Sequence, residues 1–343
     1  MTEGPQHTRD GPAASRGAQA RVWVLDDPRA GTSAQALGIA ERLGVAFRRI
    51  PLHWNWMAHL AGLAPHGSLR GVAPREGGLF DIKSGEAAPK LVISSGSRSA
   101  AVALWLKARF GCRLVHCMRP GFGMARHRAE FDLLVVPEHD GVPPGANIFP
   151  VTGAPHRVSP KVLEQAAERW ADRLDHLPHP RVALLVGGSV RGADMEPARA
   201  HGLARATAAL VAGRGGSVLA TTSRRTGAEA SDALAAGLGP VMHLLYRWGE
   251  PGENPYLGYL ATADAIVVTA DSVSMLSEAC ATQLPVYVAL PDLAGARHRR
   301  LVRALVNQGQ VRRFDRDLAG WPRPRLDEAG RVADEIRTRY GIT

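Results

Sequence analysis

The sequence lacks several features that would place it in other protein classes. Its 343 residues contain three cysteines, too few and too irregularly spaced for a disulfide framework or a zinc site. No run of about 18 apolar residues is present, so no transmembrane helix is expected. Residues 1–20 lack the apolar segment of a secretory signal. We therefore expect a cytoplasmic protein whose first 20 residues form a disordered tail.

Lysine is also scarce, since only four of the 42 cationic residues are lysine, although the net charge is +10. A GC-rich genome produces such an arginine- and alanine-rich composition without selection for nucleic-acid binding, so we expect no nucleic-acid partner. Two stretches contain no acidic residue: Lys90–Arg128 with eight cations and Arg297–Arg313 with six. These stretches could bind phosphate groups, or could hold the protein peripherally at the anionic surface of the inner membrane. Alternatively, they form only a solvated, arginine-rich face.

The catalytic and metal-binding motifs of common enzyme classes are missing. There is no Gly-x-Ser-x-Gly elbow, no His-Glu-x-x-His pair and no acidic cluster in the second half that would hold a metal. The sequence therefore predicts that any catalysis is independent of metal and of a bound cofactor.

What the sequence does contain is a repeated order of short apolar run, polar loop and helix. The apolar runs lie at 21–25, 91–93, 113–117, 131–136, 181–186, 217–221, 265–269 and 285–290. Short apolar strands between helices are typical of parallel sheets covered on both faces. We predict an α/β fold with two tandem, doubly wound, Rossmann-like domains facing a cleft.

Proline and glycine punctuation sets the expected boundaries. They are a tail at 1–20, an N-terminal domain at 21–155, a linker and helix at 156–180, a C-terminal domain at 181–325 and a last helical segment at 326–343. Ligands of open parallel sheets bind at the carboxyl ends of the strands, where the strand order reverses. The loops that follow the strands are therefore the places to look for a site.

Two such loops in the second domain suit an anion. Gly187, Gly188 and Ser189 could let backbone N–H groups approach a phosphate, or could form only a tight turn. After the next strand, hydroxyl and guanidinium groups suit a diphosphate or cap the following helix. These groups belong to Thr222, Ser223, Arg224 and Arg225.

A third stretch of the second domain combines hydroxyls with a carboxylate. Ser272 and Ser274 lie where a helix is expected to begin, so they cap it or hold phosphate oxygens. Glu278 is four residues after Ser274, on the same helix face, where its carboxylate could accept two hydroxyl protons of a ribose. Upstream, Asn254 and Tyr256 lie in a polar, proline-rich loop that could frame a nucleobase or simply form a turn.

The first domain offers candidates for a general base. Asp27 follows the first strand, in a predicted loop that also holds Thr32 and Ser33. His139 and Asp140 follow a later strand. A carboxylate or imidazole at a strand end can remove a proton from a hydroxyl, and our first choice is Asp27.

Six segments of the sequence resemble the mitochondrial-fission "elongated mitochondria" family. The longest are Glu253–Asp264 and Thr269–Ala281, and Pro285–Tyr287 follows them. Val135–Asp140, Gly187-Gly188 and Thr221–Thr226 also match, so the resemblance spans about residues 21–340. The family is named for a plant member that helps recruit a dynamin-related protein to mitochondria.

That family is similar to GT-B type glycosyltransferases, which hold a nucleotide-sugar in the second of two facing Rossmann-like domains. The resemblance implies that Glu278 holds the ribose, and that Ser272 and Ser274 hold the diphosphate, which Gly188, Ser189 and Arg224 frame. It also implies a last helix that crosses back to the first domain. The substrate would be a nucleoside-diphosphate sugar.

Three functions remain open from the sequence. The first is a metal-independent GT-B glycosyltransferase acting on an envelope or lipid-linked acceptor. The second is a nucleotide-sugar epimerase or hydrolase on the same fold, which needs no acceptor. The third is an adaptor without catalysis that keeps the fold and binds a partner protein.

Overall fold

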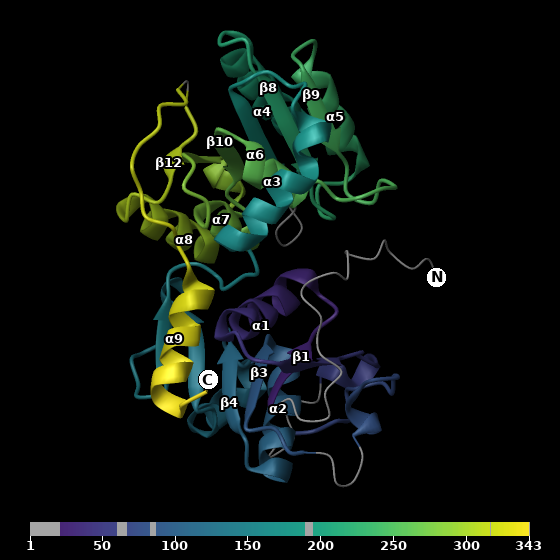
Figure 1. The fold of residues 1–343 in the computed structure, drawn as a ribbon, viewed down its shortest axis with the longest axis vertical. Coiled ribbons are helices and arrows are strands. Elements are labelled where there is room, and N and C mark those ends of the chain that lie inside the picture. Colours follow the sequence, from purple (N-terminus) through teal and green to yellow (C-terminus); the bar gives the residue numbers. More distant parts are fainter. Residues whose placement is uncertain (1–20, 60–66, 83–86, 189–194, 316, 343) are drawn as a thin grey trace. The chain divides into compact units, whose positions relative to one another are not determined.

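The computed structural model describes residues 21–59, 67–82, 87–188, 195–315 and 317–342. They divide into two compact units (Figure 1). Among the described residues, the C-terminal unit covers 158–326, and the N-terminal unit joins 21–157 to 327–342. Each unit has its own six-stranded sheet. Within the described ranges, no helix is long and apolar enough to cross a membrane.

The N-terminal unit is a parallel sheet in the order β2-β1-β3-β4-β5-β6. Its strands are β1 (Val22–Asp26), β2 (Phe47–Pro51), β3 (Leu91–Ser95), β4 (Arg113–Cys117), β5 (Leu133–Pro137) and β6 (Ile148–Val151). Its helices are α1 (Ala30–Leu43), α2 (Ser97–Phe110) and α9 (Glu328–Tyr340), with shorter 3-10 segments η1 (Trp56–His59), η3 (Leu79–Asp81), η4 (Phe122–Glu130) and η5 (Glu138–Asp140).

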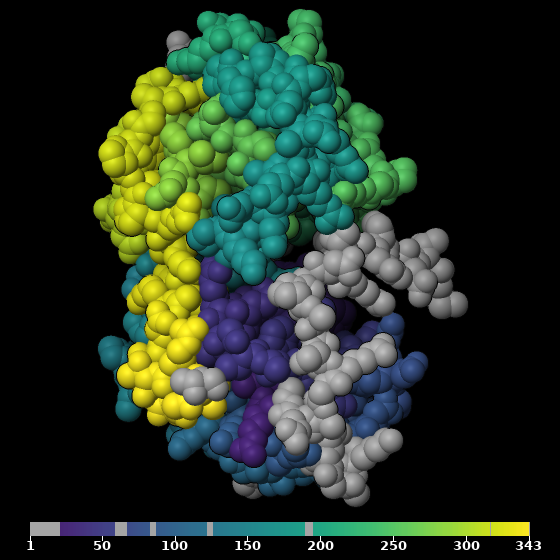
Figure 2. Space-filling model, viewed as in Figure 1, coloured from purple at the N-terminus to yellow at the C-terminus, as the bar shows by residue number. Residues whose placement is uncertain are grey.

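Successive side chains along β1 point to opposite faces of the sheet, and each face has its own hydrophobic core. Val22 and Val24 join the cluster with α1 and α9, whereas Trp23 and Leu25 join the cluster with α2. The last helix, α9, buries Ala329, Val332, Ala333 and Ile336 in the first of these clusters. Figure 2 shows the yellow surface of α9 against the purple surface of α1. The N-terminal unit is therefore built from two separate parts of the chain.

The C-terminal unit has the sheet order β12-β11-β10-β7-β8-β9, again parallel. Its strands are β7 (Arg181–Val186), β8 (Ser217–Thr222), β9 (His243–Tyr246), β10 (Ala265–Thr269), β11 (Val286–Ala289) and β12 (Arg312–Arg313). Its helices are α3 (Pro160–Leu174), α4 (Pro197–Ala212), α5 (Ala228–Leu238), α6 (Tyr256–Thr262), α7 (Val273–Cys280) and α8 (Ala296–Asn307), with the 3-10 segment η6 (Pro291–Leu293).

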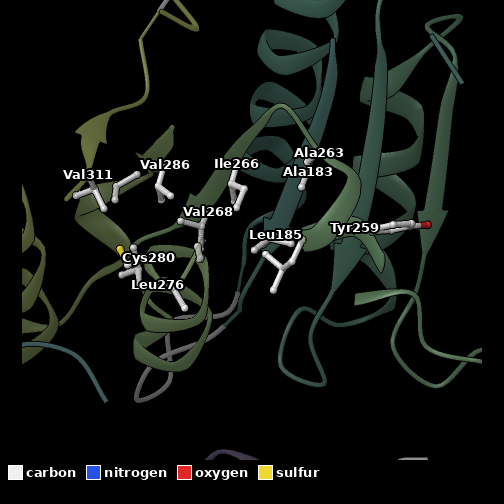
Figure 3. Close-up of a cluster of buried hydrophobic side chains, with 14 of the residues drawn as sticks. Ala183, Leu185, Tyr259, Ala263, Ile266, Val268, Leu276, Cys280, Val286 and Val311 are labelled. Carbon is white, nitrogen blue, oxygen red and sulfur yellow. The ribbon is translucent and has the colours of Figure 1, made fainter. Parts of the chain in front are cut away.

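The core beneath α7 fixes the position of that helix on the sheet. Leu276 and Cys280 on α7 pack with Val268 of β10 and Val286 of β11 in one buried cluster (Figure 3). Because these residues are fully buried, α7 has little freedom to shift along the sheet. The polar residues of α7 are therefore held at a defined place beside the end of β10.

Several elements differ from their predicted form. Helix α1 begins at Ala30, inside the predicted loop, so Thr32 and Ser33 lie in α1 and not in a loop. The sequence reading also missed β2, β6, β9, β12 and α8. Residues 158–180 belong to the C-terminal unit, where α3 packs on α6.

Candidate functional site

The strand order of the C-terminal unit reverses between β7 and β10. From β7 the chain proceeds to β8 and β9 on one side, and β10, β11 and β12 lie on the other. In parallel α/β sheets this reversal leaves a crevice at the carboxyl ends of the strands, where ligands bind. Gly187 follows β7 and Asp271 follows β10, so both border that position.

Gly187 and Gly188 lack side chains at two places where Asp271 and Arg225 approach the backbone closely. A Cβ atom on Gly187 would overlap the Asp271 carboxylate, and one on Gly188 would overlap the backbone of Arg225. Their N–H groups are also engaged: Gly187 N donates to Thr269 Oγ1 over 2.8 Å, and Gly188 N donates to Asp271 Oδ2 over 2.7 Å. The predicted anion cradle of these two N–H groups is therefore not formed. Ser189 lies outside the described residues.

Thr226 fixes the loop after β8 to the glycine turn. Its buried hydroxyl donates to the carbonyl of Gly187 and accepts from Ser223 N over 2.9 Å. Ser223 Oγ in turn accepts from Arg225 N over 3.2 Å. Ser223 thus shapes the turn itself. It does not cap the following helix, whose N-cap is Gly227 without a side-chain hydrogen bond.

The remaining predicted residues of this loop divide into engaged and exposed ones. Thr222 is buried and its hydroxyl accepts from Trp248 N over 2.9 Å. Arg225 extends toward Asp271, with Nη2 at 3.5 Å from Oδ2. Arg224 is exposed. Among these, Arg224 has the guanidinium best placed to meet a ligand from solvent.

Tyr256 and Glu278, predicted as separate contacts, lie together. The Tyr256 hydroxyl donates to Glu278 Oε2 over 2.6 Å. Tyr256 is the first residue of α6, and Asn254 Oδ1 accepts from its N–H over 3.0 Å, so Asn254 shapes the start of that helix. Glu278 Oε1 makes no hydrogen bond within the described part of the chain. One carboxylate oxygen is therefore available to a ligand.

Burial sets the charge of Glu278. Loss of hydration raises the pKa of the Glu278 carboxyl to about 7, although the hydrogen bond from Tyr256 acts in the opposite direction. Burial, together with the neighbouring Glu278, also raises the pKa of Tyr256 well above its usual range. The tyrosine therefore stays protonated, and Glu278 changes charge near neutral pH.

The N-terminus of α7 lies four residues before Glu278. Ser272 caps the helix, with its hydroxyl accepting from Met275 N over 3.4 Å. Ser274 Oγ is half-buried and makes no hydrogen bond to the described residues. The backbone N–H groups at the start of a helix favour anions, so Ser274 and this N-terminus can hold a phosphate.

Two residues at this edge were not selected from the sequence. Asp271 is fully buried beside Gly188. His298 lies in the first turn of α8, where burial lowers the pKa of its imidazole. His298 was read only as part of a basic stretch. An aspartate directly after a strand and before a capped helix was the available signal for Asp271.

Asp27, our first choice for a base, is saturated by its neighbours. Arg29 donates to both carboxylate oxygens, from Nε over 2.8 Å and from Nη2 over 3.1 Å, and its backbone N–H adds a third bond. Trp54 Nε1 donates to Oδ2 over 3.0 Å, and Asp27 is only 2% exposed. A substrate hydroxyl would have to displace one of these donors, so the structure does not present Asp27 as an open base.

His139 and Asp140 lie in η5, directly after β5, which is separated from β1 by β3 and β4. His139 is buried, and its Nε2 is 3.8 Å from Asp140 Oδ1. The two residues are adjacent to each other and lie on a different strand from Asp27. Across the residues that the structure describes, no group of three acidic, histidine or cysteine side chains could hold a metal ion.

Comparison with known proteins bears on family and fold. Residues 30–340 match the family described as "Mitochondrial fission ELM1". "Mitochondrial fission protein ELM1" of Arabidopsis thaliana is 31% identical over 280 residues, which is 73% of this chain and 63% of the plant protein, so the chain spans less than two thirds of that relative. "Uncharacterized protein RP120" of Rickettsia prowazekii is 24% identical over 358 residues, 92% of this chain and 97% of that protein.

A solved structure supports the fold. UGT89C1 of Arabidopsis thaliana, complexed with UDP, has a TM-score of 0.50 and 11% identity, covering 92% of this chain and 90% of that one. A likeness at this identity concerns the fold alone. With the two parallel sheets, it confirms the predicted α/β class with two tandem Rossmann-like domains of the GT-B type.

Proposed function

The chain belongs to the mitochondrial fission ELM1 family, and from that premise we propose that it is a metal-independent, GT-B type glycosyltransferase with a nucleoside-diphosphate sugar as donor. The donor would bind at the carboxyl edge of the C-terminal sheet. The acceptor, of the envelope or lipid-linked class, would be met by the N-terminal unit. No bound cofactor is needed in this proposal.

The observation that carries the proposal is the arrangement around Glu278. Its carboxylate is half-buried, Tyr256 holds one oxygen, and the other makes no bond to the described chain. One helical turn away, the N-terminus of α7 offers backbone N–H groups and the Ser274 hydroxyl. A ribose with a phosphate attached presents two hydroxyl donors and an anion at about that separation, so one ligand can satisfy both groups.

The chemistry needed for transfer follows from this placement. The leaving diphosphate gains negative charge in the transition state, and the α7 N-terminus together with Arg224 would stabilise it. A base must remove the acceptor's proton. Because Asp27 is saturated, His139 and Asp140 are the remaining candidates from the sequence for that role.

The saturation of Asp27 also favours a second candidate function. If the N-terminal unit supplies no base, the protein would bind the nucleotide without turnover, as the adaptor hypothesis requires. An epimerase or hydrolase differs from the adaptor because it turns the donor over, and differs from the glycosyltransferase because it needs no acceptor. The name of the plant relative concerns mitochondrial fission, and we do not extend that role to this chain.

Calorimetric titration with UDP, GDP and ADP, each alone and as its glucose ester, tests the donor site. We expect one base to bind, and Glu278→Ala to weaken it by about 10- to 100-fold, the effect of losing hydrogen bonds to a charged group. Glu229→Gln, on the exposed face of α5, is the matched control and should bind as the wild type does.

Product analysis then separates the candidate functions. Release or epimerisation of the sugar from donor alone supports the hydrolase or epimerase, and transfer only with added acceptor supports the glycosyltransferase. Binding without any turnover supports the adaptor. If the folded wild type binds none of the six compounds, the donor site is refuted.

A further inference from the structure

The structure distinguishes the two stretches of the chain that contain cations and no acidic residue. In the first stretch, Lys90–Arg128, two cations meet a carboxylate from outside it. Lys107 Nζ lies 2.7 Å from Asp132 Oδ2, and Arg113 Nη1 lies 2.9 Å from Asp132 Oδ1. The protein therefore neutralises part of this stretch itself.

The second stretch keeps its positive charge at the surface. All six of its arginines are exposed; they are Arg297, Arg299, Arg300, Arg303, Arg312 and Arg313. Among the described residues, Arg303 and Arg313 have no ion-pair partner. Of the flanking acidic residues, Asp292 and Asp317 pair with arginines of other segments, which leaves Asp315. Figure 1 shows α8 and β12, which carry these arginines, on the side of the C-terminal unit away from β9.

A comparison of two arginine-rich helices shows that composition alone does not explain this surface. On α9, each of three arginines pairs with an acidic side chain three or four residues before it. Helix α8 has four arginines and no acidic residue. A bias of the genome toward arginine would act on both helices alike. The missing acidic neighbours on α8 therefore need a separate cause, and an anionic partner supplies one.

Apolar and aromatic groups lie among these arginines. Val306 is three residues after Arg303, on the same face of α8, and is 37% exposed. Trp321 Nε1 donates to the carbonyl of Gly309 just after α8, over 2.8 Å, and its ring lies 4.3 Å from the Arg312 Cζ atom. Arginines beside aliphatic and indole groups suit the interface of a lipid bilayer better than the phosphate backbone of a nucleic acid.

We propose that the six exposed arginines of residues 297–313 bind the surface of a membrane that contains anionic lipids. The apolar side of α8 cannot enter the bilayer, because Leu301, Val302 and Leu305 are buried in the core of the C-terminal unit. The guanidinium groups therefore contact lipid phosphates while the helix rests at the level of the headgroups. This binding needs no nucleotide, so it is independent of the proposed donor site.

Co-sedimentation of the full chain with vesicles tests the proposal. The vesicles are phosphatidylcholine alone, or phosphatidylcholine with about one third phosphatidylglycerol. The test variant is Arg303→Glu/Arg313→Glu. The matched control, Arg119→Glu/Arg205→Glu, changes the net charge equally at two exposed positions. Arg119 belongs to the first stretch, and Arg205 lies on α4, which covers the face of the C-terminal sheet opposite α8.

We expect the wild type to bind the anionic vesicles at about 0.1 M NaCl and to be released at about 0.5 M, because salt screens the charges. It should not bind phosphatidylcholine alone. One arginine at an anionic surface contributes about fivefold in affinity, so the double charge reversal should weaken binding by about 25-fold or more. The control should stay within about threefold of the wild type, because its charges are remote from the contact.

Circular dichroism and thermal melting confirm that each variant is folded, and Arg303→Gln/Arg313→Gln replaces the charge reversal if that variant does not fold. A folded wild type that binds no vesicle overturns the proposal, as does equal binding to both vesicle types. Equal loss in the control and the test variant would assign the effect to net charge. Binding to a DNA or RNA duplex without binding to vesicles would identify a nucleic-acid surface instead. None of these results depends on nucleotide binding, so the donor site stands or falls separately.

Discussion

The two units have the same kind of sheet and differ at the edge where ligands bind. In the N-terminal unit the order reverses between β1 and β3, and the carboxylate there, Asp27, accepts four hydrogen bonds from Arg29 and Trp54. In the C-terminal unit the order reverses between β7 and β10, and both Asp271 and Glu278 keep an oxygen that no described residue bonds.

The difference shows what a carboxylate at a strand end contributes. One whose acceptor positions are filled by the protein stabilises its loop. One with an unfilled position lowers stability until a ligand arrives, and its cost is recovered on binding. Asp27 follows the first strand of its unit and Asp271 the fourth strand of a differently ordered sheet. A carboxylate near the reversal of strand order therefore serves structure in the N-terminal unit, and our proposal gives Glu278 a role in recognition in the C-terminal unit.

The largest expected effect is that of Asp27→Ala. It removes the acceptor of four hydrogen bonds, from the half-buried Trp54 indole and from Arg29, so we expect the free energy of unfolding to fall by about 3 kcal/mol, measured by urea unfolding. Nucleotide affinity of the folded variant should be unchanged. A variant with wild-type stability that has lost turnover would instead restore Asp27 as the base and remove the contrast between the units.

The substitution Gly188→Ala should cause the next largest loss of stability. Its Cβ atom would overlap the backbone of Arg225, so the turn that orients Asp271 must shift, at a cost of about 2–3 kcal/mol. Gly202→Ala in α4, where a Cβ atom meets nothing within 4 Å, is the control and should stabilise by about 0.5–1 kcal/mol. Thermal melting distinguishes the two, and equal effects would contradict the close approach.

Titration of Glu278 should make the stability of the protein depend on pH. The pKa of its carboxyl is raised from 4.5 to about 7, so the folded state binds the additional proton between these values, and stability falls as the pH rises through 7. Glu278→Gln removes this dependence and should be more stable than the wild type at pH 8, by about 1–2 kcal/mol, but not at pH 4.5. Urea unfolding at both pH values checks it.

The affinity for ligand should change with pH in the opposite direction to the stability. Ribose hydroxyls bond the ionised carboxylate, so affinity for a nucleotide-sugar should rise as the pH increases from 6 to 8, and Glu278→Gln should flatten the curve. A sugar ester is the suitable probe, since its diphosphate has no terminal phosphate that titrates in this range. A wild-type affinity that is constant with pH would argue against ribose at Glu278.

The smallest effect concerns the caps of two helices in the C-terminal unit. Ser272→Ala removes a cap whose hydrogen bond to Met275 N is 3.4 Å long, so we expect a loss of about 0.5 kcal/mol. Ser159→Ala removes the 3.0 Å cap of α3 and should cost about 1 kcal/mol. A larger loss at Ser272 in thermal melts would show that this hydroxyl stabilises more than the helix start.

Local patterns in the sequence predicted much of the fold. The strands 181–186 and 265–269 have the predicted bounds, because each is an apolar run between clear breakers. The missed β9 and β12 lie toward the outer edges of their sheet and are short, so little apolar sequence marks them. Helix α8 was hidden by its arginines, which are read first as charge.

The candidate site could be predicted only in part, because its contacts join distant parts of the chain. The pattern predicted that Glu278 and Ser274 share a helix face, which depends on residues four apart. It did not predict that Gly187 and Gly188 give their N–H groups to Thr269 and Asp271, more than 80 residues away. Nor could spacing show that Arg29 and Trp54 would occupy Asp27.

The position of α9 has a consequence for the order in which the protein forms during synthesis. Ala329, Val332 and Ile336 belong to the core of the N-terminal unit, yet they are translated after the whole C-terminal unit. At about 5–20 residues per second, the ribosome adds the intervening residues over many seconds. During that interval the first-made unit presents an uncovered apolar face beside α1, where a chaperone can bind, and the second-made unit is the first to complete its core.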